Sequence, residues 1–202
     1  MKHLLLIPFA AALLTGCTCN PTHCQNQQKE TTMPELVKLE IIEQPEIVIV
    51  GKLIRVNHDD LQAGKNPIPA FWGKCFEEGT FTTLEALANF IHNPAYVGYM
   101  NSDYEYICGM MMKPGVPVPE GFAAHTLEPT KVAVGWIKGK KDNEPAIYAN
   151  AHTLTEKTML EKGMKFNSYI KLGWCMEVYT CPRFTTPDEN GDIILDFYLP
   201  CE

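Results

Sequence analysis

The sequence is short of positive charge: 17 lysines and arginines stand against 24 aspartates and glutamates, for a net charge of −7. Domains that bind nucleic acids usually carry a basic patch or stripe, and this sequence shows none. We therefore expect no nucleic acid among its partners. Such a chain also gains little from anionic lipid, so membrane attachment would depend on an acyl anchor.

The apolar run at the amino terminus is too short to span a bilayer as a permanent helix. It extends from Leu4 to Leu14 behind the basic Lys2, which is typical of a secretory signal. Its ending, Leu13-Leu14-Thr15-Gly16-Cys17, resembles the lipobox of bacterial lipoproteins, in which the cysteine is lipidated. An ordinary exported protein and a chance apolar terminus are the alternatives. We expect lipidation at Cys17 and a place in the bacterial cell envelope, facing the periplasm or the cell surface.

Periodicity is missing from residues 18–35, which are polar and cannot bury a core. We therefore divide the chain into a lipoprotein signal peptide (1–16), a flexible tether (17–35) and one domain (36–202). Cleavage before Cys17 would remove Lys2 alone among the charged residues, leaving 16 basic and 24 acidic side chains. The tether holds three metal-ligand types, Cys19, His23 and Cys24, without a fourth ligand at a suitable spacing. We expect no metal and no cofactor.

No Ser-His-Asp or Cys-His catalytic set is evident. The histidines of the domain are scattered and are expected at the surface or in structural positions: His58, His92, His125 and His152. Of the eight cysteines, seven remain if Cys17 is lipidated, so at least one is unpaired or pairs between molecules. Cys175 and Cys201 could face each other across a carboxy-terminal hairpin, a geometry that the sequence leaves open.

Strand and helix patterns predict an α+β domain. Segments 37–42 and 47–54 are strand-like and flank Pro45, which predicts a hairpin. Apolar residues recur at helical spacing in 68–78. The remaining predicted elements are strands 96–100 and 104–112 around an Asn101-Ser102-Asp103 turn, a hairpin of 122–127 and 132–137 at Pro129, a helix over 145–162, and strands 174–181 and 193–199 joined by a 187–191 turn.

The order of these elements recurs, which predicts two similar halves. Pro45 and Gly51 are six residues apart, as are Pro129 and Gly135. The segments 106–114 and 174–182 match in length, apolar character and terminal proline, and this match aligns Glu177 with Gly109. We therefore predict a duplicated β-α-β-β module with pseudo-two-fold symmetry, whose antiparallel sheet forms a ligand groove between the halves.

Glu177 interrupts a segment that otherwise has the pattern of a buried strand, Trp174-Cys175-Met176-Glu177-Val178-Tyr179. A buried carboxylate costs several kcal/mol unless it is neutralised or used. One interpretation is alternation, with Glu177 facing water while Met176 and Val178 face the core. The other is a functional carboxylate, because Cys175 and Tyr179 share its face and are poor choices for a solvent face.

Five segments, in this order, resemble the GyrI-like small-molecule-binding domain, also called the AraC-type effector-binding domain. They are Ile68-Pro69-Ala70-Phe71-Trp72, Tyr104-Glu105-Tyr106-Ile107-Cys108-Gly109, Pro119-Glu120-Gly121-Phe122, Met176-Glu177-Val178-Tyr179 and Asp196-Phe197-Tyr198-Leu199-Pro200. The resemblance covers about residues 36–202. It implies two halves that form a groove, with an acidic residue on the groove floor among aromatic rings. Glu177 falls on the acidic position of the family's Glu-x-Tyr motif.

The resemblance implies a small, apolar and cationic ligand, because aromatic faces and a buried carboxylate both attract cations. The expected ligand-binding residues are Glu177, Tyr106, Trp174, Tyr179, Tyr198 and Trp72, with Tyr104 and Trp136 as further available rings. Tyr106, Trp174 and Tyr198 are the preferred rings. Trp72 and Trp136 could serve in packing only.

The resemblance has departures, because related regulators carry a DNA-binding helical domain ahead of this fold and only the tether precedes it here. Direct transcription control and gyrase inhibition are therefore not expected of an exported lipoprotein. The leading hypothesis is a binding module tethered to the envelope. One alternative is a hydrolase of reactive cyclopropanoid electrophiles, with Glu177 as general base and Tyr179 or Tyr198 as proton donor. The other is an envelope protein-interaction module whose groove is filled by a partner's segment or by side chains such as Met110, Met111 or Met112.

Overall fold

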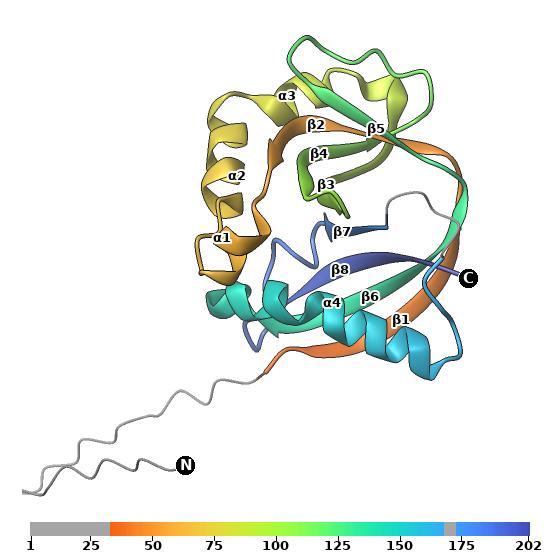
Figure 1. Ribbon diagram of the computed structural model, residues 1–202. Helices are drawn as coiled ribbons and strands as arrows, with labels where there is room; N and C mark the ends of the chain where they lie inside the picture. Colours follow the sequence, from red (N-terminus) through yellow and green to blue (C-terminus); the bar gives the residue numbers. More distant parts are fainter. Residues whose placement is uncertain (1–32, 168–172) are drawn as a thin grey trace, which may run out of the picture. The chain divides into compact units, whose positions relative to one another are not determined.

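The computed structural model describes residues 33–167 and 173–202. The predictions for the signal peptide, for lipidation at Cys17 and for Cys19, His23 and Cys24 lie outside these residues. The described part is an α+β domain (Figure 1). Its main elements are β1 (Glu35–Gln44), β2 (Ile47–Arg55), α1 (His58–Gln62), α2 (Ile68–Glu77), α3 (Thr80–Glu85), β3 (Ile91–Asn101), β4 (Glu105–Met112), β5 (Ala123–Leu127), β6 (Thr130–Lys140), α4 (Glu144–Glu161), β7 (Trp174–Tyr179) and β8 (Asp192–Cys201).

The eight strands form one antiparallel sheet in the order β1-β6-β8-β7-β3-β4-β2-β5. Strands β3 and β7 therefore meet in the middle of the sheet. Within the described part, no helix combines the length and the apolar character that a membrane span requires.

The hairpins predicted at Pro45 and Pro129 are wrong, although the four strands that flank these prolines exist. β1 pairs with β6, and β2 pairs with β4 and β5. Gln44 lies opposite Thr130 and Ile47 opposite Leu127, so the two ladders continue one register through the junctions at Pro45 and Pro129. Each proline separates two strands in sequence, but the chain runs on into the other half of the sheet instead of folding back. The predicted pairing of β7 with β8 is confirmed.

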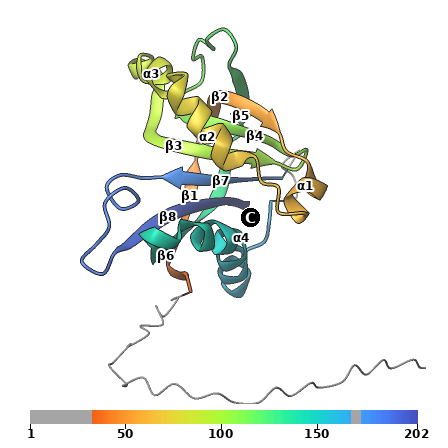
Figure 2. The same ribbon diagram turned by 90° about the vertical axis from the view of Figure 1, so that its left-hand side faces the viewer.

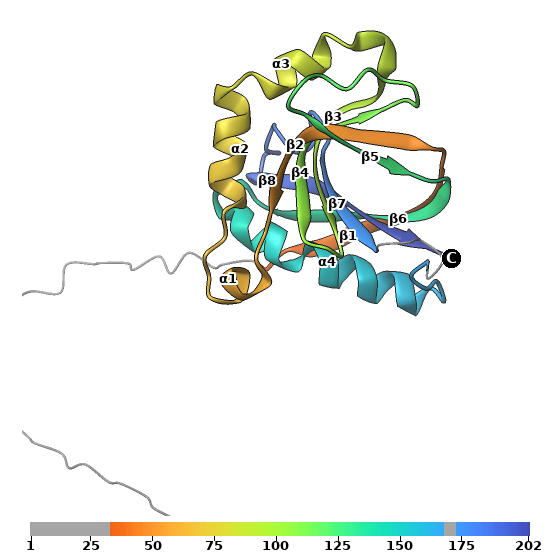
Figure 3. The ribbon, with the colours of Figure 1, turned by 45° about the horizontal axis from the view of Figure 1, so that its top comes forward.

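The two faces of the sheet pack against different partners. Residues of one face, among them Ile49, Val97, Ile107 and Met176, form a core that lies inside the curl of the sheet. On the outer face, α2 and α3 cover strands β2 to β4, whereas α4 covers β6 and β8. Figure 2 shows β3 and β7 running between α2 and α4, and Figure 3 shows α1 and α2 near one end of α4.

The helices predicted over 68–78 and 145–162 are confirmed as α2 and α4. Each begins with a proline in its first turn, where a missing backbone N–H costs nothing. Helix α2 ends before Gly79, whose φ of 68° is readily adopted by glycine. Helices α1 and α3 were not predicted, since each spans only five or six residues.

The predicted alignment of Glu177 with Gly109 is not supported by the sheet. Gly109 lies on β4 between Gly51 and Val97, whereas Glu177 lies on β7 between Gly98 and Phe197. Equal length and apolar character are shared by any two buried strands, so they do not establish equivalence. Cys175 and Cys201 do not face each other either: Met176 is opposite Tyr198, and Cys201 is opposite Lys131. All five cysteines of the described residues are free thiols.

Candidate functional site

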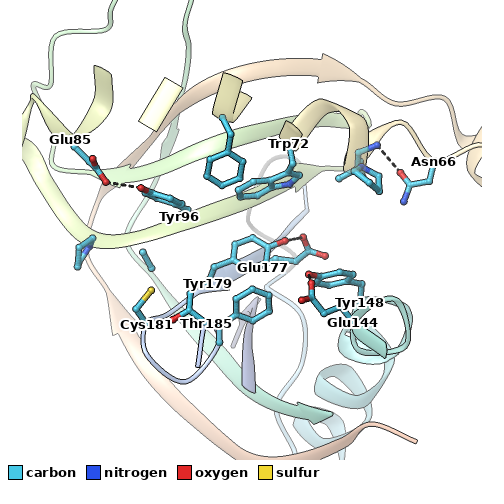
Figure 4. Close-up of a pocket in the computed structure, with 16 residues that line it drawn as sticks. Asn66, Trp72, Glu85, Tyr96, Glu144, Tyr148, Glu177, Tyr179, Cys181 and Thr185 are labelled. Carbon is cyan, nitrogen blue, oxygen red and sulfur yellow. Dashed lines mark hydrogen bonds between the residues drawn. The ribbon is translucent and has the colours of Figure 1, made fainter. Parts of the chain in front are cut away.

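A groove of about 750 Å³ lies on the helix-covered face of the sheet, where β3 and β7 meet. Its walls come from α2, the end of α3, the first turns of α4 and the segment that follows β7 (Figure 4). This volume is in the upper part of the range of about 300–1,000 Å³ that is usual for small-molecule sites.

Glu177 lies on the floor of this groove. Strand β7 alternates strictly, so Trp174, Met176 and Val178 are buried in the inner core while Glu177 and Tyr179 face the groove. Burial raises the pKa of the Glu177 carboxyl above its ordinary value, and hydrogen bonds from Tyr179 and Tyr106 oppose that rise. The predicted alternation is confirmed, but Glu177 faces a cavity rather than open surface, and its functional role stays a prediction.

One oxygen of Glu177 accepts two tyrosine hydroxyls. Tyr179 donates to Oε2 at 2.7 Å and Tyr106 donates to the same oxygen at 3.4 Å. Trp72 donates its indole N–H to the Tyr106 hydroxyl oxygen at 2.8 Å. Burial and the nearby Glu177 carboxylate hold the pKa of both tyrosines well above the ordinary value, so both stay protonated donors.

Gly98 makes this network possible. It lies on β3 between Glu177 of β7 and Cys108 of β4, so Tyr106 must reach across it. A Cβ atom at Gly98 would lie 2.1 Å from the Tyr106 hydroxyl and 2.9 Å from Glu177 Oε2. Any side chain here would therefore displace the Tyr106 hydroxyl from Glu177.

Aromatic rings form the walls around Glu177. The Tyr179 ring lies edge-on to Trp72 with centroids 4.9 Å apart, and to Phe184 at 4.8 Å. The ring centroids of Tyr148, on α4, and Tyr179 are 6.5 Å apart. These distances are within the range of favourable aromatic pairs, so the rings hold one another in place without a ligand.

Charge in the groove has one sign. Three carboxylates line it, Glu85, Glu144 and Glu177, and the described lining residues include no lysine, arginine or histidine. Tyr96 donates to Glu85 at 2.7 Å, and Tyr148 donates to Glu144 at 2.5 Å. The arrangement is suited to a cation that is bound by ring faces and carboxylate oxygens.

The segment after β7 is fixed by a separate ion pair. Asp196 of β8 is 1% exposed and accepts from Arg183 Nε at 2.9 Å, with a second guanidinium contact to its other oxygen. Thr180 donates to Asp196 Oδ2 at 2.8 Å. This pair holds the segment that supplies Phe184 and Cys181 to the groove.

No family model matches the chain, and no curated protein matches it.

Solved structures do resemble it. A Staphylococcus aureus MU50 protein assigned to bacterial transcription regulation aligns at 14% identity over 82% of this chain and 98% of that one, with a TM-score of 0.55. SAV2435 bound to tetraphenylphosphonium aligns at 14% identity over 82% and 94%, also with a TM-score of 0.55. An integron cassette protein from the mobile metagenome of Vibrio cholerae aligns at 11% identity over 84% and 99%, with a TM-score of 0.50. At these identities the likeness shows a shared fold, one that holds a small molecule in SAV2435.

The groove is lined by three of the predicted site residues, Glu177, Tyr179 and Trp72, and the buried Tyr106 is hydrogen-bonded to Glu177 and Trp72. The groove does not include Trp174 or Tyr198, which pack in the inner core on the other face of the sheet. Trp136 does not line the groove either, because it packs against the same inner core. Trp72 was predicted as a ligand-binding residue that could also serve in packing only, and its indole N–H is bonded to the Tyr106 hydroxyl of the Glu177 network.

Five residues that line the groove were not predicted from the sequence, nor was Gly98, which lies against Glu177 and Tyr106; the five are Glu85, Tyr96, Glu144, Tyr148 and Phe184. The i, i+4 spacing of Glu144 and Tyr148 at a helix start was the available signal for that pair. Nothing local distinguishes Tyr96 or Gly98 from other strand residues. Among the described residues, no group of histidine, cysteine and carboxylate side chains is arranged to hold a metal ion.

Proposed function

We propose that this protein is a binding module for small, apolar cations, which are held by Glu177 and the aromatic walls of the groove. The observation that supports it most strongly is the state of Glu177. Two hydroxyls occupy Oε2, and among the described residues no cationic side chain lines the groove. A carboxylate in low dielectric without a countercharge favours a bound cation.

The comparison with SAV2435 supports the same ligand class. That protein is bound to tetraphenylphosphonium, a monovalent cation shielded by four phenyl rings. The groove described above offers the complementary features, namely ring faces from Trp72, Tyr148, Tyr179 and Phe184 and the carboxylate of Glu177.

We propose further that the module is tethered to the bacterial envelope through a lipid at Cys17. The support comes from the sequence alone: the basic start, the short apolar run and the Leu-Leu-Thr-Gly-Cys ending. Mass spectrometry of the membrane-extracted protein tests this, since a diacylglyceryl cysteine at the mature amino terminus is expected.

We also propose that the domain is a duplicated unit with the groove between its halves. The element order supports it, because β1-β2-α2-β3-β4 is followed by β5-β6-α4-β7-β8 when the shortest helices are set aside. The counterparts are β1 and β5, β2 and β6, β3 and β7, and β4 and β8. Exchanging the two strands of every pair gives the same order of strands in the sheet, read from the opposite edge. The groove lies at β3 and β7, the strands on which the two sets meet.

Isothermal titration calorimetry with tetraphenylphosphonium tests the binding function. Wild type should bind it, and triphenylphosphine oxide, a neutral comparator with similar rings, should bind more weakly. Glu177→Gln should reduce affinity for the cation by at least about tenfold, or about 1.4 kcal/mol. Glu120→Gln, at an exposed carboxylate outside the groove, is the matched control. Equal binding by wild type and Glu177→Gln would contradict the proposal.

A hydrolase is the second candidate, because the Glu177 carboxyl combines a raised pKa with two adjacent hydroxyl donors. Such a carboxylate could activate water, with Tyr179 as proton donor. Turnover of a strained cyclopropane electrophile that is lost in both Glu177→Gln and Tyr179→Phe would favour this function over simple binding. The interaction-module alternative has less support, because Met110, Met111 and Met112 are buried in the cores and do not line the groove.

A further inference from the structure

The three groove carboxylates differ in how far their charge is compensated. Lys141 Nζ lies 2.5 Å from Glu144 Oε1, and Tyr148 donates to the other oxygen, so Glu144 already has a cation and a hydroxyl. Glu85 receives the Tyr96 hydroxyl on Oε1. Among the described residues, no basic side chain pairs with Glu85. After Glu177 on the floor, Glu85 is therefore the second carboxylate of the groove whose charge is open to a ligand.

An exposed aromatic surface accompanies Glu85. Phe76 of α2 lines the groove and is 56% exposed, although it is a large apolar ring. It packs on Phe81 at 4.8 Å, and Phe81 in turn stacks on Tyr96 at 3.8 Å. The centroids of Phe76 and Tyr96 are 6.1 Å apart. The rim thus offers two rings fixed from behind by a third, with a carboxylate bonded to one of them.

The rings and the carboxylate together have the chemistry of a cation site. A cation placed against ring faces gains from their quadrupole, and a nearby carboxylate adds its charge. The exposed ring of Phe76 on the rim is a second observation, separate from the charge of Glu85, that indicates a ligand site. Figure 4 shows Glu85 and Tyr96 on one side of Glu177, with Glu144 and Tyr148 on the other.

We propose that the ligand of this protein carries two cationic centres, one bound on the floor by Glu177 and the other on the rim by Glu85, Phe76 and Tyr96. This inference rests on the proposed function, since it assigns a second subsite to the same groove. It names a chemical class: elongated dications whose charged ends bear apolar groups and are joined by a linker.

A matched ligand pair tests the proposal. Alkyl triphenylphosphonium is the monocation, and α,ω-alkane bis(triphenylphosphonium) of several linker lengths is the dication. Two identical ends alone give a twofold statistical advantage, and the second subsite should add about fivefold. We therefore expect the best dication to bind wild type about tenfold tighter than the monocation. Glu85→Gln should remove about fivefold of this advantage, or about 1 kcal/mol, and leave monocation affinity unchanged. Phe76→Leu should act in the same direction.

Glu120→Gln is the control, because that carboxylate is exposed and lies outside the groove, and it should alter neither affinity by more than twofold. A dication advantage of twofold or less at every linker length, with Glu177-dependent binding of the monocation, would overturn the second subsite and leave the proposed function intact. Loss of the advantage in Glu144→Gln rather than Glu85→Gln would also overturn it. If neither ligand binds wild type, the proposed function fails together with this inference.

Discussion

Two carboxylates on neighbouring strands, Glu177 of β7 and Asp196 of β8, have opposite surroundings. Asp196 is almost fully buried and its oxygens accept from the Arg183 guanidinium and the Thr180 hydroxyl. Glu177 lies on the groove floor and accepts only from neutral tyrosine hydroxyls.

The difference separates a structural acid from the acid that we propose binds the ligand. The charge of Asp196 is satisfied within the fold, and its pair with Arg183 fixes the segment after β7. The charge of Glu177 is left without a cationic partner among the described residues that line the groove. Burial of a carboxylate alone therefore does not indicate a binding site. A carboxylate that lies in a cavity without a countercharge is the stronger indication.

The largest effect on stability is expected at Asp196. Asp196→Asn removes the charge that faces Arg183 and leaves the guanidinium, whose side chain is 32% exposed, with a neutral partner. Breaking a buried pair costs about 3–5 kcal/mol, and we expect the lower end because Arg183 can reach water. Urea denaturation should show a loss of about 3 kcal/mol. An unchanged midpoint would mean that the pair is not part of the fold's stability.

Gly98→Ala should come next, because its Cβ would occupy the space of the Tyr106 hydroxyl. Overpacking of this kind costs about 1–3 kcal/mol, and the displaced hydroxyl should also weaken cation binding. Gly73→Ala is the matched control: it lies in α2, where an added methyl group would meet open space, and should be stabilising by up to about 1 kcal/mol. Thermal unfolding of both variants, with calorimetry of cation binding, makes the comparison. Equal cation affinity in Gly98→Ala and wild type would show that the Tyr106 contact is dispensable.

Glu177→Gln should change stability in the opposite direction from Asp196→Asn. It should stabilise the free protein slightly, by up to a few degrees in Tm. The folded-state pKa of Glu177 is raised above its ordinary value of 4.5. The folded state therefore retains this proton to higher pH than the unfolded state, and stability falls as pH rises from that value through the raised pKa. Differential scanning calorimetry from pH 4 to pH 8 should show this fall in wild type and a smaller one in Glu177→Gln. A lower Tm for the variant than for wild type at pH 8 would show that the charge of Glu177 stabilises the fold, as that of Asp196 does.

The smallest effects distinguish the two faces of the sheet. Tyr198→Phe removes a hydroxyl from the inner core and should leave cation affinity within twofold of wild type. Tyr179→Phe removes the donor at 2.7 Å from Glu177, so the pKa of that carboxyl should rise further. Because a smaller fraction of Glu177 is then ionised at a given pH, we expect cation affinity to fall by about threefold. Fluorescence competition titrations at pH 7 can resolve this difference, and a larger effect from Tyr198→Phe would place the site on the wrong face.

The sequence was sufficient for most elements, because strand alternation and helical spacing are local signals. It was not sufficient for strand pairing: β1 and β6 lie about 90 residues apart, and nothing in either segment identifies the other as its partner. Pro45 and Pro129 suggested hairpins because proline punctuates turns, yet here each proline lies where a strand pair continues across the sheet.

Trp174 and Tyr198 were wrongly predicted as groove residues, for a reason that the sequence partly contained. Trp174 is three residues from Glu177, and an odd separation on one strand places side chains on opposite faces. Parity therefore excluded Trp174 from the groove. Tyr198 could not be excluded in this way, because its face depends on the register that sets it opposite Met176. Glu177, Tyr106 and Tyr179 were predicted correctly as neighbours, whereas Gly98 becomes informative only once Tyr106 is seen to cross it.

The measurement that tests the account most directly is the pKa of the Glu177 side-chain carboxyl, followed by NMR with ¹³C-labelled glutamate, in the free protein and with saturating tetraphenylphosphonium. Glu177→Gln identifies the resonance. In the free protein the pKa should lie above the ordinary value of 4.5, because burial outweighs the two hydroxyl donors. With the cation bound it should fall, because the ligand supplies the missing positive charge. An unchanged pKa on saturation would show that the cation does not contact Glu177, and would contradict the central claim.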